Sequence, residues 1–149
     1  MYRRPAEDRP YLKPGFVMKS VIGPLMVRAG RFPVLTVQGR TSGKPRSVPI
    51  GEPIELDGHR YLVSARGQTN WILNLRSAGC GTLRHKGVTE SFKAVEVDGD
   101  ERDRVIAAYR ALLGKAVEPA FTQLPDPACH PTFRLEEVSV VSGPRRKGI

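Results

Sequence analysis

Two short turn signals, Asp57-Gly58 and Lys86-Gly87, restrict the fold of this chain more than any other feature. Each pair lies between two runs of residues with strand character, which is the pattern of a tight β-hairpin. We therefore predict two antiparallel hairpins. Their four strands are predicted over residues 48–56, 59–65, 79–85 and 88–97.

Two prolines, Pro49 and Pro53, interrupt the first of these strands. Proline has no backbone N–H and cannot donate to a neighbouring strand, so it is confined to sheet edges and bulges. We therefore expect residues 48–56 to form an edge strand or to contain a bulge.

Residues 98–114 form the clearest predicted helix. Asp98 suits the N-cap and Glu101 stands three residues further on, as in a capping box, and Gly114 is expected to end the helix. The predicted buried face consists of Val105, Tyr109 and Leu112.

The first 30 residues contain one more predicted helix, over residues 16–29, which Pro24 should kink or divide. Its apolar stripe could cap the barrel. Alternatively, this basic, amphipathic segment could rest on an anionic membrane, or its methionines could line a pocket for an apolar substrate.

The chain has 149 residues, which suits one domain, and 40% of them are hydrophobic. Strand-dense stretches with few helices predict an α+β fold built on a small antiparallel barrel. The other expected parts are an irregular lead-in (1–13), a strand (34–38), a short helix (70–77), a loop over the barrel mouth (117–130), a strand (132–141) and a basic tail (142–149).

The net charge of +9 is high for so short a chain and predicts an anionic partner. Nucleic acid, an anionic membrane surface and a polyanionic cofactor all satisfy it. We do not expect nucleic acid, because the strands offer few aromatic side chains for base stacking. Neither a secretory signal nor an apolar run long enough to span a membrane is visible, so we expect a cytoplasmic protein with unpaired, buried thiols at Cys80 and Cys129.

The most polar feature is the turn of residues 39–49, with the sequence GRTSGKPRSVP, between two strand-like runs. Gly43 can supply the positive φ that such turns need. Cations and hydroxyls gathered on one turn form a phosphate or carboxylate site by their chemistry. The alternative is a solvated basic hairpin without a ligand.

The sequence offers no nucleophile or acid–base pair of its own, and its three histidines, His59, His85 and His130, lie far apart. A lone histidine of this kind is expected on the surface, and no metal site is predicted. An enzyme built from this chain should therefore take its reactivity from a cofactor.

The turn of residues 39–49, followed by VSARG at 63–67 and QTNWILNL at 68–75, resembles the deazaflavin-dependent nitroreductase and quinone reductase family. The resemblance implies a split β-barrel of the FMN-binding type, with an N-terminal helix and a helix after the second hairpin. It also implies coenzyme F420 as the cofactor, in preference to FMN. The residues matched to cofactor binding are Arg40, Thr41, Ser42, Arg46, Ser47, Val48, Pro49, Ile50, Gly51, Val63, Ser64, Ala65, Arg66, Asn70, Trp71, Ile72, Leu73 and Asn74.

Within that set, Arg46 is the candidate for a bidentate grip on the cofactor phosphate, with a plain surface charge as the alternative. Trp71 offers either a flat wall for the ring or a core side chain. Asn74 offers a side-chain amide.

The resemblance implies hydride transfer from reduced coenzyme F420 to a hydrophobic electrophile such as a quinone or a nitroaromatic. Three departures from the nitroreductase pattern favour a quinone or another hydrophobic acceptor: Thr41 replaces a frequent lysine, Ala65 replaces a frequent serine, and the expected tyrosine-rich segment is missing. Ser64, one position early, would face the other side of a strand. The missing segment reads Phe121, Pro125, Pro127 and Phe133 instead.

The alternative function is a non-catalytic carrier of a fatty acid, another lipid or the cofactor on the same barrel. Contact with an anionic membrane and assembly into a homodimer both remain open.

Overall fold

The computed structural model describes residues 32–142. The helix predicted over residues 16–29, the lead-in and most of the basic tail lie outside the described residues. No described helix has the length and apolarity needed to cross a membrane.

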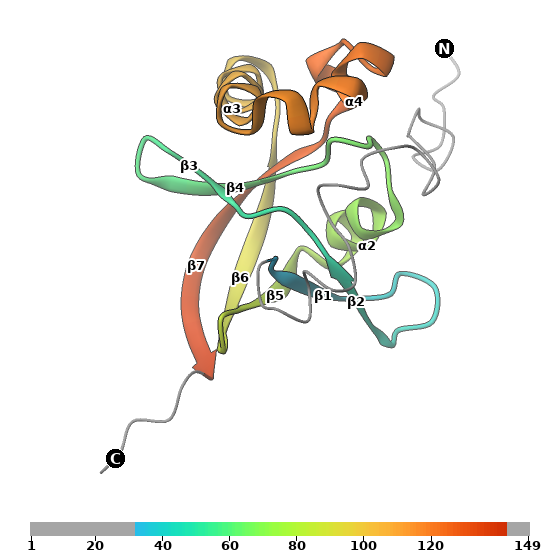
Figure 1. The fold of residues 1–149 in the computed structure, drawn as a ribbon. Coiled ribbons are helices and arrows are strands. Elements are labelled where there is room, and N and C mark those ends of the chain that lie inside the picture. The colour runs from blue at the N-terminus through green and yellow to red at the C-terminus, as the bar shows by residue number, and fades with distance from the viewer. Residues whose placement is uncertain (1–31, 143–149) are drawn as a thin grey trace.

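In residues 32–142, seven strands form one antiparallel sheet in the order β2-β1-β5-β6-β7-β4-β3 (Figure 1). The strands are β1 (Val34–Gln38), β2 (Pro45–Pro49), β3 (Ile54–Leu56), β4 (His59–Val63), β5 (Cys80–His85), β6 (Val88–Val97) and β7 (Thr132–Ser142).

Both predicted hairpin turns are confirmed. Asp57 and Gly58 have φ values of 53° and 81°, and Lys86 and Gly87 have 53° and 81°. Two successive residues with positive φ give the turn twist that matches paired strands. Strand β4 ends at Val63, two residues earlier than predicted.

The prediction of one continuous strand over residues 48–56 is wrong. The chain leaves β2 at Pro49 and enters β3 at Ile54, and these two strands lie at opposite ends of the sheet order. Each is an edge strand, as the prolines required, because an edge strand has one side that needs no N–H donor. The segment between them, residues 50–53, therefore crosses from one sheet edge to the other.

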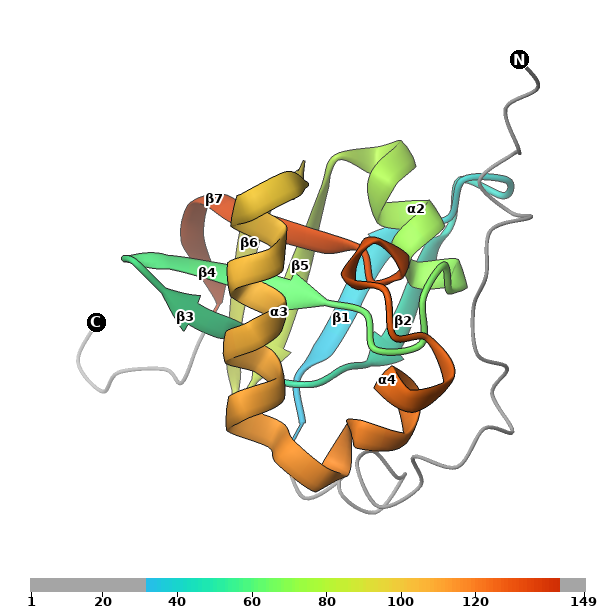
Figure 2. The ribbon, with the colours of Figure 1, turned by 90° about the horizontal axis from the view of Figure 1, so that it is seen from above.

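Two regions of helix flank the sheet. Helix α2 (Asn70–Ala78) lies beside β1 and β5, whereas α3 (Gly99–Leu113) lies across β3 and β4, and α4 (Glu118–Gln123) follows the C-terminal end of α3 (Figures 1 and 2). The loop predicted over residues 117–130 is wrong, since it contains α4 and the short 3-10 helix η3 (Pro127–Cys129), and another 3-10 helix, η2 (Gly114–Ala116), precedes α4.

The core divides between these two regions. Leu35, Ile72 and Phe133 belong to a cluster that joins α2 to the sheet. Ile106 and Phe121 belong to a second cluster, which joins α3 and α4 to the barrel.

The N-terminus of α3 differs from the predicted capping box. Asp98 holds the N-cap position but its side chain makes no capping hydrogen bond. Glu101 instead accepts hydrogen bonds from the Tyr61 hydroxyl and from Arg134 Nη1, both at 2.7 Å. These bonds fasten α3 to β4 and β7, so the carboxylate serves tertiary packing.

The described cysteines are unpaired, as predicted, but they are not both buried. Cys80 is exposed and Cys129 is half-buried. Cys80 is the first residue of β5, and its side chain is in contact with solvent.

Candidate functional site

The basic turn after β1 is a closed, hydrogen-bonded loop. The Gly39 N–H donates to Lys44 O (2.8 Å), and the Gly43 N–H donates to Gly39 O (2.9 Å). Gly43 has the predicted positive φ, 72°. The Ser42 hydroxyl accepts from the Lys44 N–H at 3.1 Å. A Cβ on Gly39 would approach Ser42 Oγ to 3.0 Å, so the loop closes this tightly only with glycine there.

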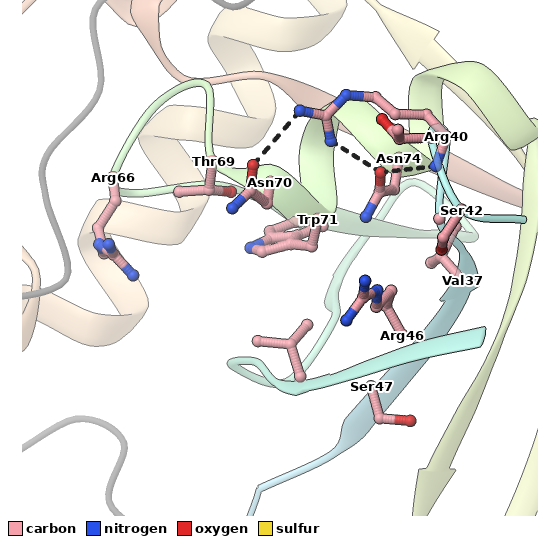
Figure 3. Close-up of a pocket in the computed structure, with 13 residues that line it drawn as sticks. Val37, Arg40, Ser42, Arg46, Ser47, Arg66, Thr69, Asn70, Trp71 and Asn74 are labelled. Carbon is pink, nitrogen blue, oxygen red and sulfur yellow. Dashed lines mark hydrogen bonds between the residues drawn. The ribbon is translucent and has the colours of Figure 1, made fainter. Parts of the chain in front are cut away.

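Helix α2 fixes the position of this turn. The Arg40 backbone N–H and its Nη1 both donate to Asn74 Oδ1, at 3.1 and 2.8 Å, and Nη2 donates to Asn70 Oδ1 at 3.4 Å (Figure 3). Asn74 is only 7% exposed. Its amide oxygen therefore holds the turn from inside the fold, and Arg40 is committed to α2 through its guanidinium.

A polar cleft of about 540 Å³ opens between the turn and α2 (Figure 3). Its walls carry cations, hydroxyls and amides together with one large aromatic ring. The lining residues are Val37, Gly39, Arg40, Thr41, Ser42, Arg46, Ser47, Val48, Arg66, Thr69, Asn70, Trp71 and Asn74.

Arg46 differs from Arg40 and Lys44, the other two cations of the turn, in its contacts. Within residues 32–142, no hydrogen bond or ion pair engages its guanidinium, and the side chain lines the cleft. Lys44 does not line the cleft. An exposed fork of N–H donors beside a cleft can take a phosphate or carboxylate in two hydrogen bonds.

A second, apolar cavity of about 270 Å³ adjoins the cleft. It lies between the crossing segment after β2, the end of β4 and the C-terminal part of α3. The lining residues are Phe32, Val48, Pro49, Ile50, Gly51, Glu52, Pro53, Ile54, Val63, Ser64, Ala65, Arg66, Thr69, Trp71, Tyr109, Leu112 and Leu113.

Four residues line both spaces: Val48, Arg66, Thr69 and Trp71. Trp71 also packs against the core cluster of α2, so the two alternatives for it were not exclusive. We call this shared wall the seam. A flat ligand lying on it would have a cation-rich space at one end and an apolar space at the other.

The seam contains an unusual group. Thr69 is 6% exposed, and its hydroxyl oxygen has no hydrogen-bond partner among the described residues. A buried hydroxyl without a partner costs stability, so such a group calls for an explanation.

His130 holds the loop that follows β4. It is fully buried, contrary to the surface position expected, and its ring stacks on Phe121 with 4.1 Å between ring centroids. Nδ1 lies 3.1 Å from Ser64 O and Nε2 lies 2.6 Å from Leu124 O. The imidazole thus ties residue 64, in the wall of the apolar cavity, to the segment after α4.

The local geometry changes the reasoning about Ser64 and Ala65. Because β4 ends at Val63, strand alternation does not apply to them, and both residues line the apolar cavity. The Ser64 hydroxyl donates to Gly67 O at 2.6 Å. It is therefore occupied in closing the loop.

The structure brings most of the sequence-derived site residues together. Ile72 and Leu73 are the exceptions, since they are buried and line neither space. All the others line the cleft, the cavity or both.

Sequence reasoning missed the contribution of α3 to the cavity. Tyr109 is 6% exposed, and within residues 32–142 its phenolic oxygen makes no hydrogen bond. Burial raises the pKa of Tyr109 well above its ordinary value, so the hydroxyl keeps its proton at neutral pH.

Leu112, assigned to the buried face, is 70% exposed at the cavity mouth. The helical stripe of residues 105, 109 and 112 was the available signal, but it reads equally well as core.

One comparison with known proteins shows the family of this chain. Residues 19–118, more than half of the chain, match the sequence model of a family described as F420H(2)-dependent quinone reductase. No curated protein shows significant sequence similarity to the chain.

Several solved structures share the fold. One, described as an F420-H2 dependent reductase (FDR-A), is 21% identical with a TM-score of 0.54, over 70% of this chain and 93% of that one. One described as a domain-swapped dimer is 23% identical with a TM-score of 0.55, over 70% and 79%. A heme binding protein from Mycobacterium smegmatis is 17% identical with a TM-score of 0.54, over 81% and 53%. At these identities the likeness shows the fold, and the predicted α+β split barrel is confirmed.

Proposed function

Because the chain belongs to the F420H(2)-dependent quinone reductase family, we propose that it transfers a hydride from reduced coenzyme F420 to a hydrophobic electrophile, a quinone in the first instance. The observation that carries the proposal is the seam, where a cation-lined cleft and an apolar cavity share the wall formed by Trp71. Hydride transfer needs donor and acceptor in contact, and two adjoining spaces of opposite polarity can hold them so.

The donor set of the cleft fits this cofactor. Its tail carries a phosphate and glutamates, and the cleft presents Arg46, without an ion pair among the described residues, beside the Ser47 hydroxyl. Arg40 is held by α2 and adds positive charge at the same end. A flat ring could lie against Trp71, while the buried Thr69 hydroxyl supplies an orphaned polar group there.

The bound cofactor would supply the hydride, and the protein would shape the acceptor site. The cavity beside the seam is lined by Val48, Ile50, Ile54 and Leu113, which exclude water from a hydrophobic acceptor. Tyr109 places a protonated hydroxyl in the same lining, where it can donate a hydrogen bond to an acceptor oxygen. Neither Ala65 nor the occupied Ser64 hydroxyl offers a donor in this way, which supports a quinone over a nitroaromatic that relies on a serine at position 65.

One observation supports the alternative carrier function. The apolar cavity could hold a lipid or another flat hydrophobic ligand without chemistry, and a heme binding protein shares the fold at a TM-score of 0.54. The fold neighbour described as a domain-swapped dimer likewise supports a homodimer as the state to look for in solution.

The test is a pair of measurements on the full chain. Fluorescence titration should show oxidised coenzyme F420 binding more tightly than FMN, and the reduced cofactor should be oxidised when menadione is added. Binding of neither cofactor at micromolar protein would remove the enzyme proposal. Co-purification of a lipid, together with that result, would favour the carrier.

A further inference from the structure

The Thr69 hydroxyl is a polar group that the folded chain buries and leaves unused. The residue is 6% exposed, and its Oγ1 has no partner among the described residues. Thr69 lines both the polar cleft and the apolar cavity. Its main-chain groups, in contrast, are engaged: its N–H donates to Gly67 O at 2.8 Å and its O accepts from the Leu73 N–H at 3.1 Å. These two main-chain hydrogen bonds fix the backbone of Thr69, and with it the position of the side chain at the seam.

The Thr69 hydroxyl also does not cap the helix that it precedes. Thr69 is the N-cap of the nine-residue helix α2, where a threonine usually accepts a hydrogen bond from the first turn. Here the side chain makes no capping bond, and the first turn carries no acidic residue. The positive end of the helix and an uncommitted, buried hydroxyl therefore lie together at the start of α2, where Thr69 lines both spaces.

The surroundings select the kind of ligand atom. Figure 3 shows Thr69 and Arg66 at one end of the cleft, Arg40, Ser42 and Arg46 at the other, and Trp71 between them. An anionic tail is best placed with the cations of the turn. A flat ring lying along the face of Trp71 would bring its edge, which can carry carbonyl oxygens, to Thr69.

We propose that Thr69 Oγ1, with the N-terminus of α2, binds a carbonyl oxygen on the ring of the bound deazaflavin and so sets the orientation of that ring at the seam. This inference rests on the proposed function for the identity of the ligand. It assigns to Thr69 a binding role that neither the sequence motifs nor the family match supplies. Thr69 is then a group left unsatisfied in the free protein so that the cofactor can satisfy it.

Two variants separate binding from folding. Thr69→Val keeps the shape and removes the hydroxyl, whereas Thr69→Ser keeps the hydroxyl. In the free protein, Thr69→Val should melt at the same temperature as wild type or higher, because no hydrogen bond is lost. Its affinity for oxidised coenzyme F420 should fall about tenfold, the effect of one lost hydrogen bond of ordinary strength. Thr69→Ser should bind within about twofold to threefold of wild type.

A third measurement places the contact on the ring. The phosphate-free deazaflavin core should lose affinity for Thr69→Val by the same factor as the whole cofactor. A loss confined to the whole cofactor, or a change only in the KM for menadione, would place the hydroxyl against the tail or the acceptor and overturn the assignment.

The remaining outcomes are also decisive. A lower melting temperature for free Thr69→Val would mean that the hydroxyl serves the fold, and unchanged affinity would mean that it meets no ligand; either overturns the inference while the proposed function stands. A wild-type chain that binds neither the cofactor nor its core would overturn the proposed function itself.

Discussion

Asn74 Oδ1 accepts two hydrogen bonds from Arg40, one from the backbone N–H at 3.1 Å and one from Nη1 at 2.8 Å. The two residues are 34 positions apart, in α2 and in the turn after β1. A buried amide oxygen thus fixes both the main chain and the side chain of the residue that begins the cation-rich end of the cleft. In this position the Asn74 side chain orients the site.

Asn74→Ala should therefore affect both folding and binding. Removing the acceptor breaks both hydrogen bonds that Arg40 donates to Asn74, which should cost about 1–3 kcal/mol of unfolding free energy. It should also weaken cofactor binding, because the turn loses its anchor. Thermal melting and deazaflavin titration measure the two effects. The control is Asn70→Ala, which removes only the exposed 3.4 Å contact to Arg40 and should melt within a few degrees of wild type. Equal behaviour of the two variants would contradict the anchoring role.

Arg46→Ala should weaken coenzyme F420 binding roughly tenfold to a hundredfold. A charge-assisted fork on a phosphate contributes about 1.5–3 kcal/mol, and each 1.4 kcal/mol is a factor of about ten. Lys44→Ala is the matched control from the same turn. It should cost only a few-fold because Lys44 does not line the cleft.

The dependence of cofactor affinity on salt concentration gives a second test, on wild type and Arg46→Ala. Raising ionic strength from about 0.05 to 0.5 M shortens the screening length severalfold, so wild-type affinity should fall. Arg46→Ala should fall less, having lost the charge that salt would screen. Flat salt dependence in wild type, with Arg46→Ala binding normally, would place the anionic tail outside this cleft.

Leu112→Asn should impair the acceptor and spare the cofactor. Leu112 is 70% exposed and lines only the apolar cavity among the two adjoining spaces, so its replacement should leave stability nearly unchanged. The KM for a long-tailed quinone should rise a few-fold, since roughly one to two buried methylene groups of contact are lost. Steady-state kinetics and deazaflavin titration measure the two sides. Val140→Asn, at an equally exposed position (66%) on β7 outside both linings, should change neither. A matching loss of deazaflavin affinity in Leu112→Asn would argue against separate sites for donor and acceptor.

Glu101 should make stability depend on acid pH. The hydrogen bond from Arg134, then that from Tyr61, lowers the pKa of Glu101 below its ordinary value of 4.5. A carboxylate with a lowered pKa in the folded state adds stability above its ordinary pKa, and this stability is lost as pH falls through the folded value. Wild type should therefore lose melting temperature steadily below about pH 4.5.

Glu101→Gln is the matching variant. It should melt lower than wild type at pH 7, because Arg134 loses the charged acceptor bound at 2.7 Å, and its melting temperature should change less below pH 4.5. Parallel pH curves for the two proteins would show that other carboxylates govern acid unfolding.

Features that depend on neighbouring residues along the chain could be predicted from the sequence. Asp57-Gly58 and Lys86-Gly87 specified two hairpins because turn conformation is a local property. Pro49 and Pro53 specified edge strands because each removes its own N–H donor, although the split of residues 48–56 between two sheet edges was not visible locally. Most of the motif residues line the cleft or the cavity, while their roles toward a cofactor stay predictions.

The role of each side chain, in contrast, depends on contacts between residues far apart in the sequence. Glu101 follows the spacing of a capping box, yet Tyr61 and Arg134 bring donors from 40 and 33 positions away. His130 became buried because α4 forms and places Phe121 against it, and Leu112 became a cavity rim because the segment after β2 crosses beneath α3. Thr69 gives the clearest case: it holds the N-cap position of α2, yet its buried hydroxyl makes no capping bond and has no partner among the described residues. A polar group bonds to any partner that the fold brings within about 3 Å. For residues tens of positions apart, sequence spacing does not reveal which partner that is.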